Sequence, residues 1–331
     1  METLRIGILG CGGHAGAHAR RYRDRDDVAI VALCDRDPDQ IASLVARRLD
    51  SYSPAPARFT DPTQMYREAA LDAVSILTPH HLHAEHIIQA LEAGCHVLVE
   101  KPMVASTDEA AAVHAAATAH GKHVLTCFNP PFTDAVAAVR RAVADGSLGE
   151  LRLVNAWLTQ DWRRLTAGSW RQQAAISCGG QCGDSGAHLL AGLCWAVGVA
   201  PEQVYARLER RGTEVPIDGA LLIDFPGGVH ATVAIGGDSA HDGSHAVFAF
   251  TDGHIEVDLW RGSWHRVVDG QDPGERQEGS ESDPNAHFLD VVAGRAPALI
   301  TITDAMVQAA LLQAMVASDE SGQPQAITVP D

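Results

Sequence analysis

A glycine-containing turn near the N-terminus constrains the fold of this chain more than any other feature. The apolar run 4–9 leads directly into Gly10-Cys11-Gly12-Gly13-His14-Ala15, and a second apolar run ends at Asp35, about twenty residues later. Gly10 permits a tight turn, Gly12 leaves room for an approaching phosphate, and Ala15 keeps the following helix close to the sheet. The helix N-terminus would then face the pyrophosphate of a dinucleotide. We therefore expect a Rossmann fold that starts within the first ten residues.

The first 127 residues alternate short apolar runs with helix-like segments. This alternation is typical of a doubly wound parallel sheet whose two faces are both covered. The expected strands are 4–9, 28–34, 73–77, 96–99 and 123–127, and the expected helices are 39–49, 82–93 and 107–120. The pattern predicts an α/β dinucleotide-binding domain over residues 1–127.

The pattern changes after residue 127, and 331 residues are enough for a second domain. An Ala-rich helix is expected over 134–144, followed by alternating strands over 220–225 and 229–235. Pro226-Gly227-Gly228 and Asp252-Gly253 are hairpin signals. We predict that residues 128–331 form an α+β domain with a large, mostly antiparallel open sheet for substrate binding and oligomerisation. The polar stretch 270–283 is interpreted as an exposed loop before a last pair of helices.

Charge and composition restrict the class of partner. The formal net charge of -17 repels phosphate backbones and anionic lipids, so we expect neither nucleic acid nor a membrane as a partner. The first residues lack a basic leader, and no apolar run reaches about 18 residues, so the expected location is the cytoplasm. Seven cysteines are an odd number for a disulfide framework, and we expect reduced thiols.

The residue that ends the second strand indicates which nicotinamide cofactor is bound. Asp35 would accept hydrogen bonds from the adenosine ribose hydroxyls and would repel a 2'-phosphate, which favours NAD over NADP. Arg36 opposes this preference, because its guanidinium could stack on adenine or turn towards a 2'-phosphate. NAD is therefore the predicted cofactor, and NADP is the alternative.

Further motifs resemble a known family. They are Thr78-Pro79 with His83, then Glu100-Lys101-Pro102, and later Gly179-Gly180 with Asp184 and His188. Their order and spacing resemble the glucose-fructose oxidoreductase and inositol dehydrogenase family, Gfo/Idh/MocA. The resemblance covers the nucleotide domain and the first part of the second domain, and weakens after about residue 200. It implies that Lys101 lies beside the nicotinamide, that Asp184 and His188 come from the second domain, and that subunits form dimers or tetramers.

The chemistry of hydride transfer independently suggests a role for each of these residues. A hydride leaves a carbinol carbon as the hydroxyl proton is removed, so the site needs a base and a cation. Asp184 and His188 are four residues apart, and in a helix they would share one face. We assign His188 as the base, because an unperturbed imidazole titrates near neutrality, and Lys101 as the cation that stabilises the oxygen. Asp184 would bind a neighbouring hydroxyl and help to hold Lys101.

These interpretations define the predicted site. The catalytic residues are Lys101, Asp184 and His188. The cofactor-binding residues are Gly10, Gly12, Gly13, His14, Ala15, Asp35, Arg36, Thr78, Pro79, His83, Glu100 and Lys101. The predicted function is NAD(P)-dependent oxidation of a secondary alcohol on a sugar, inositol or related polyol. The alternatives are a glycosidase that retains NAD and oxidises its sugar transiently, and a nucleotide-binding regulator without catalysis, against which the three catalytic residues argue.

Several histidines, cysteines and tryptophans have alternative interpretations. His80, His81, His83 and His86 are crowded together, but around a helix start they would fan out rather than converge on a metal. Cys178 and Cys182 have a spacing that zinc could use in a helix, but the glycines beside them favour a loop, so no metal is expected. Trp157, Trp162 and Trp170 could line a substrate pocket, although tryptophan in a strand-rich domain packs more often in the core.

The expected sheet has a weakly polar second side. Residues 231, 233 and 235 are apolar, and the intervening His230, Thr232 and Ala234 are only partly polar. A sheet face of this kind favours coverage by a second subunit. We therefore expect a homodimer or homotetramer.

Overall fold

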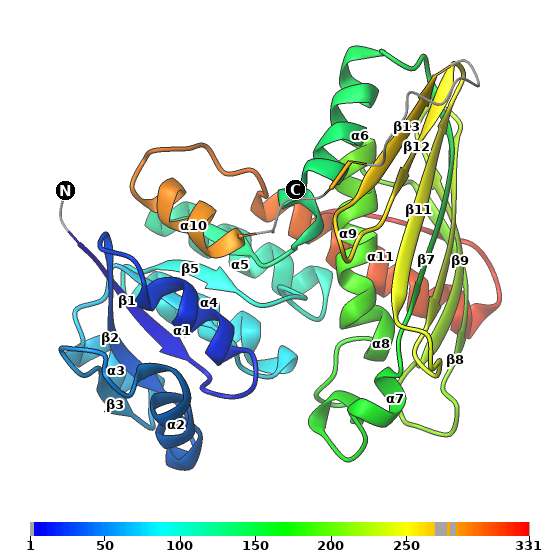
Figure 1. Cartoon of the computed structure of the whole chain (residues 1–331). Helices are drawn as coiled ribbons and strands as arrows, with labels where there is room; N and C mark the ends of the chain where they lie inside the picture. The colour runs from blue at the N-terminus through cyan, green and yellow to red at the C-terminus, as the bar shows by residue number, and fades with distance from the viewer. Residues whose placement is uncertain (1–2, 269–276, 279–282, 331) are drawn as a thin grey trace. The chain divides into compact units, whose positions relative to one another are not determined.

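The computed structural model describes residues 3–268, 277–278 and 283–330. The chain divides into two compact units (Figure 1). The first contains Met1–Val104, Asp108–Cys127 and Asp283–Ile302, and the second contains Ala105–Thr107, Phe128–Ser282 and Thr303–Asp331.

The first unit contains a six-stranded sheet in the order β3-β2-β1-β4-β5-β6, in which every neighbouring pair is parallel. The strands are β1 (Leu4–Leu9), β2 (Val28–Cys34), β3 (Ala57–Phe59), β4 (Ala73–Ile76), β5 (His96–Val99) and β6 (Val124–Thr126). This order confirms the predicted Rossmann sheet. Strand β3 was not predicted, because two of its three residues are exposed and the strand is too short to show a period.

The helices of this sheet are α1 (Ala15–Arg23), α2 (Pro38–Leu44), α3 (Pro62–Glu68), α4 (His83–Glu92) and α5 (Thr107–His120). The structure continues α2 as a π-helical turn, Val45–Leu49, where one helix over 39–49 was predicted. Two of these helices begin at an aspartate followed by proline. Asp37 and Asp61 accept hydrogen bonds from the backbone N–H groups of Asp39 and Thr63, which satisfies donors that a helix start leaves free.

The two units differ from the predicted domains, 1–127 and 128–331, chiefly in one C-terminal segment. Helix α10 (Pro284–Val292), orange in Figure 1, lies within the predicted second domain but belongs to the first unit. Phe288, Leu289 and Val291 are buried in the same apolar cluster as the β1 residues Ile6 and Ile8. Burial of these side chains is the physical reason that the chain returns to its first unit.

The second unit contains an eight-stranded sheet in the order β13-β12-β11-β7-β10-β9-β8-β14. Its strands are β7 (Leu151–Thr159), β8 (Gln203–Glu209), β9 (Asp218–Phe225), β10 (Val229–Gly236), β11 (Gly243–Phe250), β12 (Gly253–Val257), β13 (Trp264–Val268) and β14 (Gln325–Ala326). All neighbours are antiparallel except β7 and β10. The mostly antiparallel open sheet and its two predicted hairpins are therefore confirmed.

The helices of the second unit are α6 (Asp134–Asp145), α7 (Trp162–Leu165), α8 (Gly180–Gly183), α9 (Ser185–Val197) and α11 (Ile302–Ser321). Helix α9 packs against β7 and is buried at almost every residue (Figure 1). Short 3-10 turns occupy Pro130–Phe132 and Trp170–Gln172 in this unit, and His80–Leu82 in the first unit. Along β10, residues 229, 231, 233 and 235 are buried and residues 230, 232 and 234 are exposed, as the alternation predicts.

Most of the predicted loop 270–283 lies outside the described residues, and the expected pair of final helices is α10 and α11. Over the described ranges, the structure contains no helix with the length and apolar character needed to cross a bilayer. All seven cysteines are free thiols.

Candidate functional site

The turn between β1 and α1 has the form of a phosphate cradle. Gly10 has a φ of 92°, and a Cβ at this position would lie 2.7 Å from the carbonyl carbon of Leu77. At Gly12 and Gly13 a Cβ would meet nothing within 4 Å, so open space lies over the backbone at the helix start. Ala15 is fully buried where α1 meets the sheet. The turn therefore fits the pyrophosphate of a dinucleotide, as its sequence predicts.

Asp35 lies at the carboxyl end of β2 and contacts this turn. Its Oδ2 accepts a hydrogen bond from the backbone N–H of Cys11 at 2.8 Å, and its Oδ1 accepts one from Asp37 at 3.0 Å. A carboxylate offers about four acceptor positions, so acceptor capacity remains for ribose hydroxyls. His14 and Arg36 are exposed near the same edge of the sheet. These positions suit the adenosine half of a dinucleotide.

His83 connects two of the predicted cofactor-binding segments. Its Nε2 lies 2.8 Å from the carbonyl oxygen of Thr78, and its Nδ1 lies 2.8 Å from that of Pro102. Burial lowers the pKa of His83, and the carbonyl acceptors, which favour the protonated ring, offset this only in part. Because the imidazole is fully buried, it has no exposed surface with which to touch a cofactor. We infer that it holds the segments at Thr78-Pro79 and Pro102 in register.

Lys101 follows β5 and is only 6% exposed. Its backbone N–H donates to Oε2 of Glu100 at 3.3 Å, and its peptide bond to Pro102 is cis. Burial by itself would raise the pKa of the Glu100 carboxyl. The hydrogen bond from His18 and nearby basic groups, Lys101 among them, nevertheless hold that pKa well below its usual range. Glu100 is therefore a carboxylate, and it holds the backbone from which the Lys101 side chain departs.

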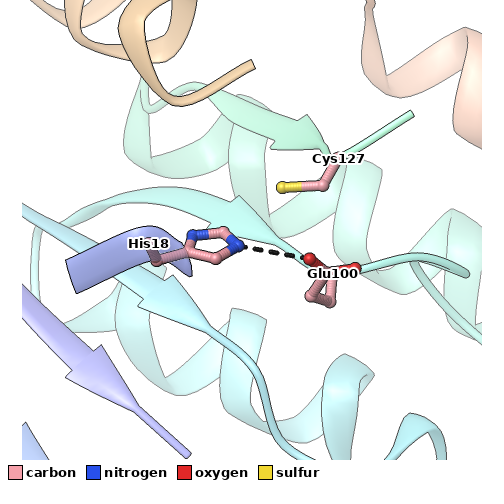
Figure 2. Close-up of side chains that lie close together, drawn as sticks. All are labelled: His18, Glu100 and Cys127. Carbon is pink, nitrogen blue, oxygen red and sulfur yellow. Dashed lines mark hydrogen bonds and ion pairs between the residues drawn. The ribbon is translucent and has the colours of Figure 1, made fainter. Parts of the chain in front are cut away.

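A cluster beside Lys101 was not predicted from the sequence. Figure 2 shows His18 of α1 and Glu100 pointing toward one another, with Cys127 nearby after β6. Each of the three residues has an atom that could bind a metal, and these atoms all lie within 4.8 Å of one another. His18 Nε2 is 3.2 Å from Glu100 Oε1. Burial raises the pKa of the Cys127 thiol well above its usual value, and His18 Nε2 already contacts a carboxylate. These contacts fit a hydrogen-bonded cluster better than a metal site.

In the second unit, glycines shape the approach to α9. Gly180 has a φ of 56°, and a Cβ at Gly183 would lie 1.6 Å from the carbonyl oxygen of Cys178, so both positions require glycine. The prediction of a loop beside Cys178 and Cys182 was wrong for residues 180–183, which form the short helix α8. Within the described part of the chain, the only group of three or more clustered metal ligands found contains neither cysteine.

Asp184 lies directly before α9 and is held by two side chains. Its Oδ2 accepts hydrogen bonds from Trp162 Nε1 at 2.8 Å and from Arg171 Nε at 3.1 Å. The Arg171 guanidinium also stacks over the ring of Trp170, 4.5 Å from its centroid. Asp184 is buried beside these donors. Trp162 is therefore buried, as is usual for a core tryptophan, and it also contacts a predicted catalytic residue. The contact of Arg171 with Asp184 was not predicted from the sequence.

His188 lies one turn further along, inside α9, and its side chain is buried. The backbone N–H of Asn129 lies 3.4 Å from its Nδ1, which is long for a hydrogen bond, and the ring of Trp260 meets it edge-on. Asp184 and His188 thus come from one helix start, as their spacing predicts. The structure gathers Thr78, His83, Glu100 and Lys101 in the first unit, and Asp184 and His188 in the second.

Two family models match most of the chain. The model described as "Oxidoreductase family, NAD-binding Rossmann fold" matches residues 4–128. The model described as "GFO/IDH/MocA C-terminal domain" matches residues 136–256.

Individual proteins show more limited similarity. D-glucoside 3-dehydrogenase of Escherichia coli (strain K12) is 32% identical over 200 residues, which cover 60% of this chain and 55% of that enzyme. A glycosyl hydrolase family 109 protein of Shewanella pealeana is 30% identical over 155 residues, or 46% of this chain and 34% of that protein. These alignments thus span about half or less of the curated relatives. A levoglucosan dehydrogenase structure in complex with NADH shares the fold, with a TM-score of 0.85 and 20% identity over 99% of this chain and all of that one.

Proposed function

Because this chain belongs to the Gfo/Idh/MocA family of oxidoreductases with an NAD-binding Rossmann fold, we propose that it transfers a hydride between NAD and a secondary alcohol. The alcohol would belong to a sugar, an inositol or a related polyol. The observation that carries this proposal is the set of buried polar groups in the family's motif positions, namely Lys101 after β5 and the pair Asp184 and His188 at the start of α9. The dehydrogenase names of several relatives agree with this chemistry.

Each of these residues has a separate task in the proposed reaction. Bound NAD would supply the hydride acceptor for this reaction. The ammonium group of Lys101 stabilises the negative charge that develops on the substrate oxygen. His188 accepts the hydroxyl proton. Asp184, fixed by Trp162 and Arg171, accepts a hydrogen bond from a neighbouring hydroxyl and so orients the substrate.

The same proposal assigns the adenosine ribose to Asp35. Its carboxylate is held by the phosphate turn itself, through the N–H of Cys11. A 2'-phosphate beside this carboxylate would bring two negative charges together, which favours NAD over NADP. The exposed Arg36 is the residue that would support NADP.

A substrate panel tests the proposal directly. Purified protein is mixed with NAD or NADP and with sugars, inositols and other polyols, and NADH or NADPH formation is followed by its near-ultraviolet absorbance. We expect sustained reduction of NAD with at least one member of the panel, and loss of that activity in Lys101→Met. Turnover that is unchanged in Lys101→Met would refute the assigned chemistry.

A second candidate is a glycosidase that retains NAD and oxidises its sugar transiently. The similarity to a glycosyl hydrolase family 109 protein and to an alpha-N-acetylgalactosaminidase favours it. Nitrophenyl glycosides distinguish the two candidates. A glycosidase releases nitrophenol with no net change in NADH, whereas the dehydrogenase accumulates NADH with each turnover.

We also propose that the chain forms a homodimer or homotetramer through the exposed face of the eight-stranded sheet. Leu153 on β7 and Leu222 on β9 are 46% and 43% exposed on this face. Thr232 and Ala234 of β10 are exposed on the same side. Apolar side chains on the open face of a sheet favour coverage by a partner of the same kind.

A further inference from the structure

A chain of polar contacts runs through the interior of the first unit and ends at Lys101. Arg21 Nη1 donates to Asn285 Oδ1 at 3.0 Å, and Asn285 Nδ2 lies 2.8 Å from His18 Nδ1. His18 Nε2 lies 3.2 Å from Glu100 Oε1, and Glu100 Oε2 accepts the backbone N–H of Lys101. His18 and Asn285 are 2% and 1% exposed. The contacts thus link α1 and α10 to the end of β5.

The chemistry of the partners fixes the direction of each hydrogen bond. A guanidinium only donates, so the oxygen of the Asn285 amide must face Arg21, and its NH2 group must face His18. An amide NH2 also only donates, so Nδ1 of His18 accepts and carries no proton. The ring proton therefore lies on Nε2 and is donated to the Glu100 carboxylate (Figure 2). Arg21 and Asn285 together select one tautomer of His18.

This selection has a consequence for the proposed chemistry. Glu100 accepts a hydrogen bond from Nε2–H of His18 on one oxygen and one from the backbone N–H of Lys101 on the other, so both oxygens of the carboxylate are held. A displacement of about 1 Å in a catalytic group can cost roughly a hundredfold in rate. We propose that His18 and Asn285 are positioning residues, which fix Lys101 through Glu100 and touch neither substrate nor cofactor. The inference rests on the proposed function, in which Lys101 stabilises the substrate oxygen.

The position of His18 adds a connection to the cofactor cradle. His18 lies about one helical turn after Ala15, on the helix that begins at the phosphate turn. Movement of α1 would therefore displace the donor to Glu100 as well as the phosphate-binding N–H groups. The same helix carries the cradle and the contact that positions Lys101.

Two substitutions of His18 form a matched pair. In His18→Gln the side-chain amide reaches the place of Nε2 and can still donate to Glu100. In His18→Asn the shorter amide reaches only the place of Nδ1, so Glu100 loses this donor. Both residues are uncharged and differ by one methylene group, so they disturb packing to a similar degree.

The first readout separates catalysis from binding. We expect His18→Asn to lower kcat by about ten- to a hundredfold and to leave the Kd of NAD within about twofold. His18→Gln should keep kcat within about threefold of the wild-type value. If His18 had a merely structural role, kcat would instead fall to a similar degree in both variants, together with their thermal stability. That result would overturn the inference.

The second readout needs no substrate and so remains valid if the proposed function fails. In histidine-labelled protein, ¹H–¹⁵N spectra distinguish protonated from unprotonated ring nitrogens, and the His18 signals are identified by their loss in His18→Gln. We expect a proton on Nε2 and none on Nδ1. In Asn285→Asp the new carboxylate should bring a proton to Nδ1. A wild-type ring protonated at Nδ1 contradicts the proposed chain of polar contacts.

Hydrogen exchange at the Lys101 amide completes the test. This N–H should exchange about tenfold faster in His18→Asn than in wild-type protein, and at a nearly unchanged rate in His18→Gln. Equal exchange in all three proteins would overturn the inference. If exchange follows this pattern while no polyol is oxidised, the chain of polar contacts is supported and the dehydrogenase assignment is the part that fails.

Discussion

The two sheets of this protein differ in how their faces are covered. In the first unit, β4 is buried at all four residues, which shows that both faces of the parallel sheet are covered at this strand. In the second unit, β10 alternates between buried and exposed residues, so one face of the sheet is packed and the other is open. At β4 the first sheet is therefore covered on both faces by its own chain, whereas at β10 the second sheet has one exposed face.

The predicted site residues show a related contrast. In the first unit, Lys101 follows a buried strand, and backbone groups contribute to holding its segment. In the second unit, Asp184 depends on two side chains, Trp162 and Arg171. Substitutions in the two units should therefore have different effects.

The largest effect is expected at Lys101. Lys101→Met keeps the length of the side chain but removes the charge that stabilises the substrate oxygen. We expect kcat to fall by about two to four orders of magnitude with the Kd of NAD nearly unchanged. Lys122→Met, a lysine outside the proposed site, serves as the control and should keep normal kcat. Retention of more than about a tenth of the activity in Lys101→Met would make Lys101 structural.

His188 should give the next largest effect. We expect His188→Asn to lower kcat by about two to three orders of magnitude, because the proposed base is removed. Asp184→Asn should in addition raise KM, since Asp184 is assigned to binding a second hydroxyl. Steady-state kinetics on the substrate found in the panel measures both constants. His120→Asn, at the exposed end of α5, is the matched control. A normal kcat in His188→Asn would exclude His188 as the base.

A charge on the exposed face of the eight-stranded sheet should weaken subunit association and leave the fold of one chain unchanged. Leu222→Lys places a charge at a position that is 43% exposed, so it should not disturb the core of one chain. In an apolar interface, however, it should weaken association by about 2 kcal/mol or more. Light scattering should show a dimer or tetramer of the 35.1 kDa chain in wild-type protein, shifted toward monomer in the variant. A wild-type monomer at micromolar concentration would refute the proposed interface.

Asp35 should control the choice of cofactor. We expect NAD to bind more tightly than NADP in wild-type protein, and Asp35→Ala to reduce this preference by about tenfold, the effect of roughly 1.4 kcal/mol. Calorimetric titration with each dinucleotide provides both constants. NADP binding as tight as that of NAD would instead assign control of the pocket to Arg36.

The smallest effect concerns acid stability and His96. Burial, together with the positive charge of Lys122, lowers the pKa of His96 from 6.5 to about 4, and its Nδ1 accepts the backbone N–H of His123. Because the unfolded chain binds more protons between these two values, stability should fall as the pH drops from about 6.5 to 4. We expect a contribution of about 1 kcal/mol once solvent exposure is considered. Urea denaturation followed by circular dichroism should show a weaker pH dependence in His96→Gln. An identical dependence would exclude His96 as the cause.

Local patterns in the sequence determined much of this architecture. The turn from Gly10 to Ala15 and the acidic residue at the end of β2 predict a dinucleotide-binding unit, because their spacing is characteristic of one β-α-β segment. Alternation over β9 and β10 predicts their sheet, and the intervening Pro226-Gly227-Gly228 predicts their hairpin. The spacing of Asp184 and His188 places them about one helical turn apart. Each of these features depends on residues close together in the chain.

Only the tertiary structure decided how the site residues are held. His18 contacts Glu100 across 82 residues and Asn285 across 267 residues, and α10 returns to a unit whose other elements end by residue 127. Asp184 likewise meets Trp162 and Arg171 through single side-chain hydrogen bonds. Such contacts have no period and no fixed spacing, so they leave no recognisable pattern in one sequence. They form when burial brings distant elements together and each buried polar group must find a partner.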